Sequence, residues 1–337
     1  MKNTLYLLTG LLLAFSACQQ NEIDFQLSEI KINNVFLKTN AAAVEHLNRT
    51  KLCYARDSFY FLNLSKSKQW LRVNLSDGTA RVNHCPLTGE VQAVHYGLDE
   101  LVVASADSLF YFTLHGTPPA AYASPLDTTE FIVNPIPVSN ECLHRYGDYW
   151  YVQLGNLRNE PNLVDTSVLL FFNRDTSFKK FDYPRPYTER YLQNYTVQVA
   201  HHGPHFFYAP SLLPQLSRRR LDDRDPLDLA LNPRGFLTFD TTKWNDALYI
   251  YNYSLSTKKN VRLLANADYV FLIQGIPASK QGQWTYECLV LDHDLQLRSS
   301  FSLPERIDVN TITATSAGLF IFHPYRSAIV QCSPKVN

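Results

Sequence analysis

The stretch Tyr269-Val270-Phe271-Leu272-Ile273 joins aromatic and β-branched residues without a charged or turn-forming residue. This is the composition of a β-strand, and its consecutive apolar positions indicate that both strand faces are covered. Similar runs recur along the chain: Phe59-Tyr60-Phe61-Leu62, Leu101-Val102-Val103, Tyr149-Trp150-Tyr151-Val152, His205-Phe206-Phe207-Tyr208 and Leu319-Phe320-Ile321-Phe322. The six runs begin at residues 59, 101, 149, 205, 269 and 319, which are 42, 48, 56, 64 and 50 residues apart. The spacing predicts a repeated structural unit.

Each unit contains further strand-like segments after its first run. In the first unit, residues 69–73 are followed by the turn pair Asp77-Gly78 and by residues 79–82. In a later unit, Leu248-Tyr249-Ile250-Tyr251-Asn252-Tyr253 is predicted to be a strand that leads to residues 261–264. A four-stranded propeller blade needs about 40–50 residues, so six such units predict an all-β, six-bladed β-propeller. Seven blades, or a pair of two-sheet sandwiches, are the alternatives.

The last unit, residues 311–333, is at least one strand short. Residues 25–32 alternate in polarity for most of their length and could supply the missing strand. A strand from the other end of the chain would close the ring and pair sheet edges that otherwise favour aggregation. Residues 41–47 are the one predicted short helix.

The N-terminus has the pattern of a secretory signal. Lys2 is followed by a mostly apolar run over residues 5–15 and then by Phe15-Ser16-Ala17-Cys18. The run is shorter than the roughly 20 apolar residues of a transmembrane helix, and small residues before a cleavage site are typical of an export signal. Cys18 after this small pair resembles a bacterial lipobox, in which the thiol is acylated. An ordinary signal with a chance cysteine is the alternative. The predicted divisions are a signal peptide (1–17), a lipidated tether (18–23) and a propeller domain (24–337).

The lipobox, the six units and segments such as Phe59-Tyr60-Phe61-Leu62-Asn63-Leu64 resemble the TolB-like, six-bladed propeller lipoproteins of Bacteroidota. This resemblance implies a protein that is attached to the bacterial outer membrane by its lipid, on either the periplasmic or the surface-exposed side. It implies no catalytic residue. The chain departs from the pattern in its low glycine content, since propeller turns usually use more than the 12 glycines present.

Composition excludes some partners. The 31 basic and 31 acidic residues cancel, so no global field attracts nucleic acid. Five cysteines remain after Cys18, and their odd number leaves at least one unpaired within the chain. These cysteines are Cys53, Cys85, Cys142, Cys288 and Cys332. We predict that they are buried and act as small hydrophobic residues. Their spacing does not identify disulfide partners.

Candidate binding residues lie in the long stretch 210–244, which has no clear strand pattern. It contains Arg218-Arg219-Arg220, whose guanidinium groups could hold phosphate or a carboxylated sugar. Asp222, Asp223 and Asp225 follow, so local pairing is the alternative. Trp244 lies at the edge of this predicted loop and could stack on a sugar ring.

Two other clusters are interpreted as turns. His201-His202-Gly203-Pro204-His205 contains a Gly-Pro turn signal, and the rings are expected to point to different faces rather than to hold a metal. Asp292-His293-Asp294 is interpreted as a turn or strand end, because consecutive strand residues point to opposite faces.

No catalytic motif, metal site or cofactor is predicted. The sequence therefore indicates a membrane-anchored binding or scaffolding module for an unknown protein, peptide or glycan. A carbohydrate-active hydrolase or lyase with its site in the propeller channel, and a structural envelope component, are the alternatives.

Overall fold

The computed structural model describes residues 23–31, 51–55, 58–63, 69–74, 79–84, 93–96, 100–104, 108–113, 120–123, 143–154, 166–173, 177–184, 197–222, 226–243, 246–278, 283–307, 309–323, 326 and 328–335. Its regular structure consists of β-strands, apart from the helix α4 (Ala247–Ser256) and the short 3-10 turns η4 (Thr241–Lys243) and η5 (Val309–Thr311). The all-β prediction is therefore confirmed. Within these residues, no helix has the length and hydrophobicity needed to cross a membrane.

The described strands assemble into six four-stranded antiparallel sheets. The first sheet holds β2 (Lys51–Ala55), β3 (Ser58–Asn63), β4 (Gln69–Asn74) and β5 (Ala80–His84). The second holds β6 (Ala93–Tyr96), β7 (Glu100–Ala104), β8 (Ser108–Thr113) and β9 (Ala120–Ala123). The third holds β10 (Leu143–Tyr146), β11 (Tyr149–Leu154), β12 (Thr166–Phe172) and β13 (Ser177–Pro184). The fourth holds β14 (Val197–His202), β15 (His205–Pro210), β16 (Gln215–Arg220) and β17 (Leu227–Ala230).

The fifth sheet holds β18 (Lys259–Ala265), β19 (Val270–Pro277), β20 (Trp284–Leu291) and β21 (Leu297–Ser302). The sixth holds β22 (Thr313–Thr315), β23 (Gly318–His323), β24 (Ala328–Pro334) and β1 (Phe25–Lys31). In this last sheet β1 runs antiparallel to β24, with Phe25 opposite Pro334 and Lys31 opposite Ala328. Sequence order is therefore followed within each sheet except the last, in which the two ends of the described chain are paired.

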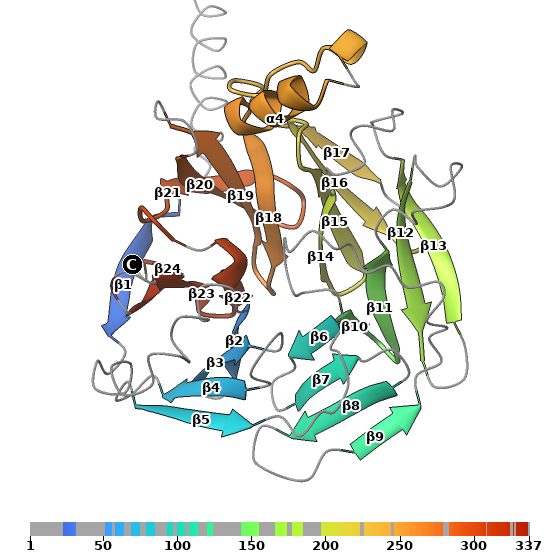
Figure 1. Cartoon of the computed structure of the whole chain (residues 1–337), viewed down its shortest axis with the longest axis vertical. Helices are drawn as coiled ribbons and strands as arrows, with labels where there is room; N and C mark the ends of the chain where they lie inside the picture. The colour runs from blue at the N-terminus through green and yellow to red at the C-terminus, as the bar shows by residue number, and fades with distance from the viewer. Residues whose placement is uncertain are drawn as a thin grey trace, which may run out of the picture.

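The sheets follow one another around a common centre, and their innermost strands are β2, β6, β10, β14, β18 and β22 (Figure 1). Innermost strands of successive sheets make contact, as β14 does with β18, β18 with β22, and β22 with β2. Radially arranged four-stranded antiparallel sheets are the architecture of a β-propeller.

The up-and-down order of the strands gives the molecule two faces. Within a sheet, a turn that joins the first two strands and a turn that joins the last two lie at the same end of the molecule. We call this end the hairpin face. It includes the turns 203–204, 266–269, 292–296 and 315–318, and hydrogen bonds join three of them, from Asn266 Nδ2 to the Thr315 carbonyl and between His293 Nε2 and the Asn266 carbonyl. The opposite end carries the turn 211–214 and the connection 231–258, and we call it the α4 face.

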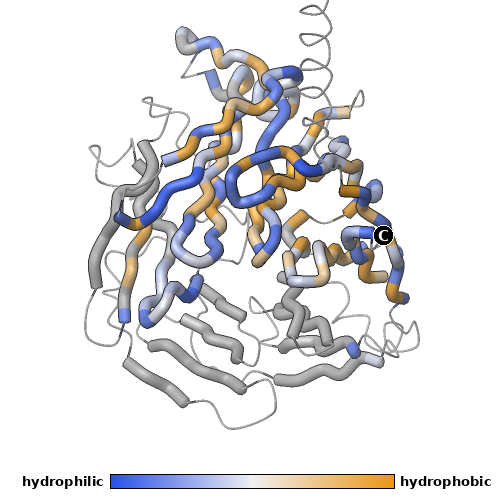
Figure 2. The backbone as a smooth tube through the Cα atoms, turned by 180° about the vertical axis from the view of Figure 1, so that it is seen from behind, coloured by the Kyte–Doolittle hydropathy of each residue, from blue (hydrophilic) through white to orange (hydrophobic). Residues whose placement is uncertain are grey.

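The core lies between neighbouring sheets. In the fifth and sixth sheets, one cluster of buried side chains joins Phe271, Ile273, Cys288, Leu319, Ile321, Val330 and Cys332. Hydrophobic residues accordingly concentrate along these strands (Figure 2). Cys288 and Cys332 are buried, as predicted, and both are free. Burial raises the pKa of the Cys332 thiol to about 12 and that of Cys288 well above its ordinary value, so neither forms a reactive thiolate at neutral pH.

The prediction of a strand at residues 248–253 is wrong, because these residues belong to α4. The Asp246 carboxylate caps the helix by accepting a hydrogen bond from the Tyr249 N–H at 3.0 Å. Tyr249 and Tyr253 lie one turn apart, and both rings pack against Phe239, at 5.3 and 5.0 Å between centroids. Capping and this aromatic packing outweigh the strand propensity of the tyrosines.

The stretch 210–244 is less irregular than its sequence indicates, since it contains β16 and β17. The predicted helix at residues 41–47 and the turn Asp77-Gly78 lie outside the described residues. So do Cys18, Trp244, Asp223 and Asp225, as well as the cysteines Cys85 and Cys142 and the side chain of Cys53.

Candidate functional site

The predicted binding residues Arg218, Arg219 and Arg220 lie on strand β16 and not on a loop. Leu216 and Ser217 of this strand are buried, and Arg218 lies opposite Phe207 of β15. The strand was hidden in the sequence because its second half is charged. Alternation along the strand sends Arg218 to one face of the sheet and Arg219 to the other.

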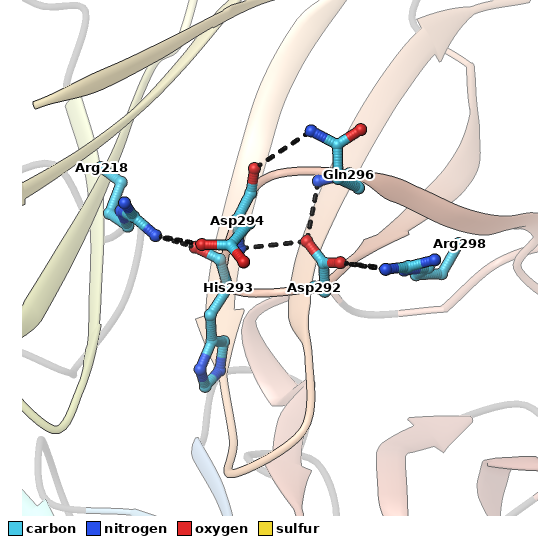
Figure 3. A network of polar contacts seen from close by, with 6 residues as sticks. All are labelled: Arg218, Asp292, His293, Asp294, Gln296 and Arg298. Atoms are coloured by element: carbon cyan, nitrogen blue, oxygen red, sulfur yellow. Dashed lines mark hydrogen bonds and ion pairs between the residues drawn. The ribbon is translucent and has the colours of Figure 1, made fainter. Parts of the chain in front are cut away.

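Arg218 reaches across from the fourth sheet to the fifth (Figure 3). Its side chain is 7% exposed, and its Nη1 donates to the His293 carbonyl at 2.9 Å and to Asp294 Oδ1 at 2.6 Å. Both acceptors belong to the turn between β20 and β21. Arg218 therefore fastens two sheets together on the hairpin face.

The turn that receives Arg218 is built around Asp292. Asp292 Oδ1 accepts hydrogen bonds from the backbone N–H groups of Asp294 at 3.0 Å and Gln296 at 2.8 Å. Its Oδ2 accepts from Arg298 Nε at 2.9 Å, on the adjoining strand. The interpretation of this stretch as a turn is confirmed, and Asp292 and Asp294 bind different partners rather than form a carboxylate pair with His293 (Figure 3).

The other two arginines are also held by carboxylates. Arg219 Nη2 contacts both carboxylate oxygens of Asp228 on β17, at 2.8 and 3.0 Å. Arg220 pairs with Asp222 at 3.4 Å, as the alternative of local pairing predicts. An anion would have to compete with these carboxylates for the arginines, and of the three only Arg218 joins two sheets.

Replacing Arg218 by methionine should lower the free energy of unfolding by about 1–3 kcal/mol, because the His293 carbonyl loses its charged donor while the carbonyl itself stays in place. Asp294→Asn is the matched variant. The Asp294 side chain is 78% exposed, so losing its charge should cost less than about 1 kcal/mol. Urea unfolding of both variants measures the difference. Equal losses would mean that the ion pair, and not the contact with the carbonyl, provides the stabilisation.

The histidine cluster around Gly203-Pro204 forms the predicted turn between β14 and β15, with Gly203 at φ +54°. The rings do point to different sides. His201 Nδ1 lies 2.8 Å from the Tyr151 hydroxyl of the third sheet, whereas the His202 ring lies 5.1 Å from that of His293 in the fifth. Among the described residues, no three histidine, cysteine, aspartate or glutamate side chains are grouped as a metal site would require.

The α4 face carries exposed apolar residues. Leu237, Leu248 and Tyr251 are 47%, 69% and 59% exposed, and the ten residues of α4 include no charged side chain. The helix lies beyond the ends of β18 and β19 (Figure 1). Its other side packs through Tyr253 on Leu212 of the turn between β15 and β16. A helix with apolar residues on both sides is unusual at a surface facing only water.

Two consecutive lysines lie beside α4. Lys258 is the last residue of the connection 231–258, and Lys259 is the first residue of β18. Lys258 is buried and pairs with Glu287 at 3.7 Å. Lys259 is half-buried, and its Nζ lies 4.9 Å from the centre of the Trp284 ring. Sequence reasoning missed this pair, because the two residues lie 25 positions apart and meet only through the pairing of β18, β19 and β20. We take the α4 face, with Lys259 and Trp284, as the candidate functional surface.

No known protein-family model matches the chain, and no curated protein does. The structure is similar to that of a DUF4221 family member from Bacteroides vulgatus, with a TM-score of 0.62 and 10% identity over 95% of this chain and 99% of that one. It is also similar to a protein of Bacteroides fragilis described as exported, with a TM-score of 0.58 and 8% identity over 93% and 96% of the two chains. At these identities the likeness shows a common fold alone.

Proposed function

We propose that this chain is an exported binding or scaffolding module, anchored in the bacterial outer membrane through a lipid on Cys18, whose α4 face receives its ligand or partner. In this proposal the six sheets are the blades of a propeller that the pairing of β1 with β24 closes, as in TolB-like propeller lipoproteins. The Bacteroides fragilis neighbour, described as exported, supports the proposed compartment.

The observation that carries the proposal is where the N-terminal segment joins the ring. The Ile23 N–H donates to the Arg298 carbonyl at 3.1 Å, and Arg298 lies next to the turn 292–296 of the hairpin face. Asp24 is held at the same end, because its carbonyl accepts from the Lys335 N–H at 2.8 Å and its carboxylate from Lys335 Nζ at 2.9 Å. A chain anchored at Cys18 therefore enters from the hairpin face.

Five residue steps separate Cys18 from Ile23, and an extended chain spans about 3.5 Å per step, or roughly 18 Å. The hairpin face is then held within this distance of the bilayer, and the α4 face is turned away from it. Exposed apolar residues on the α4 face are consequently available to a partner outside the membrane and not to the lipids that hold the anchor.

The test of the anchor is Cys18→Ala. Wild-type protein is expected to incorporate labelled palmitate and to partition into detergent, whereas the variant is expected to do neither, because acylation requires the thiol. Gln19→Ala keeps the thiol and serves as the control. A Cys18→Ala protein that still carries the label would refute lipidation at this residue.

The orientation has its own test. A fluorophore is attached at Ser316→Cys on the hairpin face or at Tyr251→Cys on the α4 face, in lipidated protein whose Cys53, Cys85 and Cys142 are replaced by serine. Energy transfer to acceptor lipids in vesicles is expected to be stronger from position 316. Equal or stronger transfer from position 251 would contradict the proposed orientation.

A further inference from the structure

We propose that Lys259 and Trp284 form a binding site on the α4 face for a carboxylate carried on a sugar ring, such as a uronic acid. The inference rests on the proposed function in using the α4 face as the binding surface, and it names the ligand class of that surface.

The site is created by the register of three strands. Lys259, the first residue of β18, lies opposite Gly275 of β19, and Gly275 lies opposite Tyr286 of β20. Trp284 begins β20 at the same end of the sheet. All of these positions are at the end of the fifth sheet that carries the α4 connection.

Gly275 makes the contact possible. A Cβ at this position would lie 3.1 Å from a Trp284 ring carbon and 3.2 Å from Val261 Cγ1, which is tighter than most real contacts. Without a side chain at 275, the indole can lie over the middle strand and bring its ring to 4.9 Å from Lys259 Nζ. Trp284 as a whole residue is half-buried and not fully enclosed, and we infer that part of its indole is open to a ligand.

Lys259 differs from its neighbours in its charge balance. Lys258 has Glu287 at 3.7 Å, and Lys243, which lies 5.0 Å from the Tyr249 ring centre, has Asp240 at 3.6 Å. Within the described part of the chain, no carboxylate lies within ion-pair distance of Lys259. Burial lowers the pKa of the Lys259 ammonium because the cation has lost water, and no carboxylate of the described residues compensates for this loss.

A ligand carboxylate would supply the missing counter-charge through a charge-assisted hydrogen bond. The indole beside it offers an apolar surface for the C–H face of a sugar ring, and such aromatic surfaces with a few polar groups are typical of small-ligand sites. Because both groups are needed, the site should prefer a charged sugar to a neutral one and to a carboxylate without a sugar ring.

The experiment measures binding of D-glucuronate to the full mature chain by calorimetry and tryptophan fluorescence, with D-glucose and benzoate as comparison probes. Glucuronate is expected to bind saturably and more tightly than either comparison. Lys259→Met and Trp284→Leu should each weaken glucuronate binding by about tenfold or more, while Lys259→Arg should retain most of it. Lys243→Met removes a comparable cation over a ring on the same face and should leave binding unchanged.

Glucuronate that fails to saturate, or binds the Lys259→Met chain as tightly as the wild type, would overturn the site. Benzoate binding as tightly as glucuronate would overturn the sugar assignment. Circular dichroism melts of each variant establish that it is folded before titration. Lipidation is not needed for these titrations. A negative binding result would therefore not argue against lipidation at Cys18, and a chain that is not lipidated could still be tested for glucuronate binding.

Discussion

The Gly318→Ala variant is expected to lose about 3 kcal/mol or more of its free energy of unfolding. Gly318 begins β23 with φ at +111°, a conformation that an L-residue with a side chain rarely adopts. A Cβ there would also collide with the Cys332 carbonyl oxygen on the paired strand β24. Since the obstacle is backbone, no side-chain rotation relieves it, and the β23–β24 pairing must shift. Urea unfolding followed by circular dichroism measures the loss.

The controls for this variant are Gly147→Ala and Gly203→Ala. Both glycines have positive φ, at +58° and +54°, but a Cβ at either position meets no atom within 4 Å. Each substitution should therefore cost only the left-handed conformational penalty of about 1 kcal/mol. A Gly318→Ala variant as stable as these two would contradict the close approach of β23 and β24, and with it the observed register of Leu319 opposite Cys332.

The recurrent apolar runs identified the second strand of each sheet, and there is a physical reason for it. These strands are covered on both faces by neighbouring sheets, so apolar residues are needed at consecutive positions. In β15, for example, Phe206, Phe207 and Tyr208 are all fully buried although their side chains alternate in direction. Outer and innermost strands carry weaker signals, because one face or one edge meets polar groups.

The sequence pattern gave the wrong structure for two segments, the strand that carries Arg218 and the helix α4. In both cases the interactions that decide the structure involve residues outside the segment, which a local pattern does not include. The charge of Arg218 is balanced by Asp294, 76 residues away, so a strand with a buried arginine looks like a loop in the sequence. In α4 the tyrosines favour a strand by composition, but their spacing matches the packing on Phe239. The Lys259–Trp284 pair is a third case, since only strand register brings it together.

Acid is expected to destabilise the protein through His201. The ring lies among the aromatic rings of the third and fourth sheets, 5.3 Å from Tyr151 and 5.6 Å from Phe206 between centroids. Burial lowers the pKa of His201 from 6.5 to about 4, and the positive charge of His202 on the same strand adds to this. A hydrogen bond to the Arg145 backbone acts in the opposite direction but is outweighed. His201 is therefore neutral in the folded protein at pH 7.

The protein loses stability in acid because the pKa of His201 is lower in the folded chain than in the unfolded chain. Below pH 6.5 the unfolded chain binds a proton on His201, whereas the folded chain does not bind it until about pH 4. Between these pH values the unfolded state therefore carries more protons. The free energy of unfolding consequently falls as the pH falls from 6.5 to 4. The stabilisation from neutral His201 is complete above pH 6.5, and its loss by pH 4 amounts to at most about 3 kcal/mol.

Urea unfolding at several pH values should show a shallower decline of the free energy of unfolding for His201→Gln, which cannot titrate. If His201→Gln loses stability as steeply as the wild type between these pH values, the imidazole is not the excluded proton site.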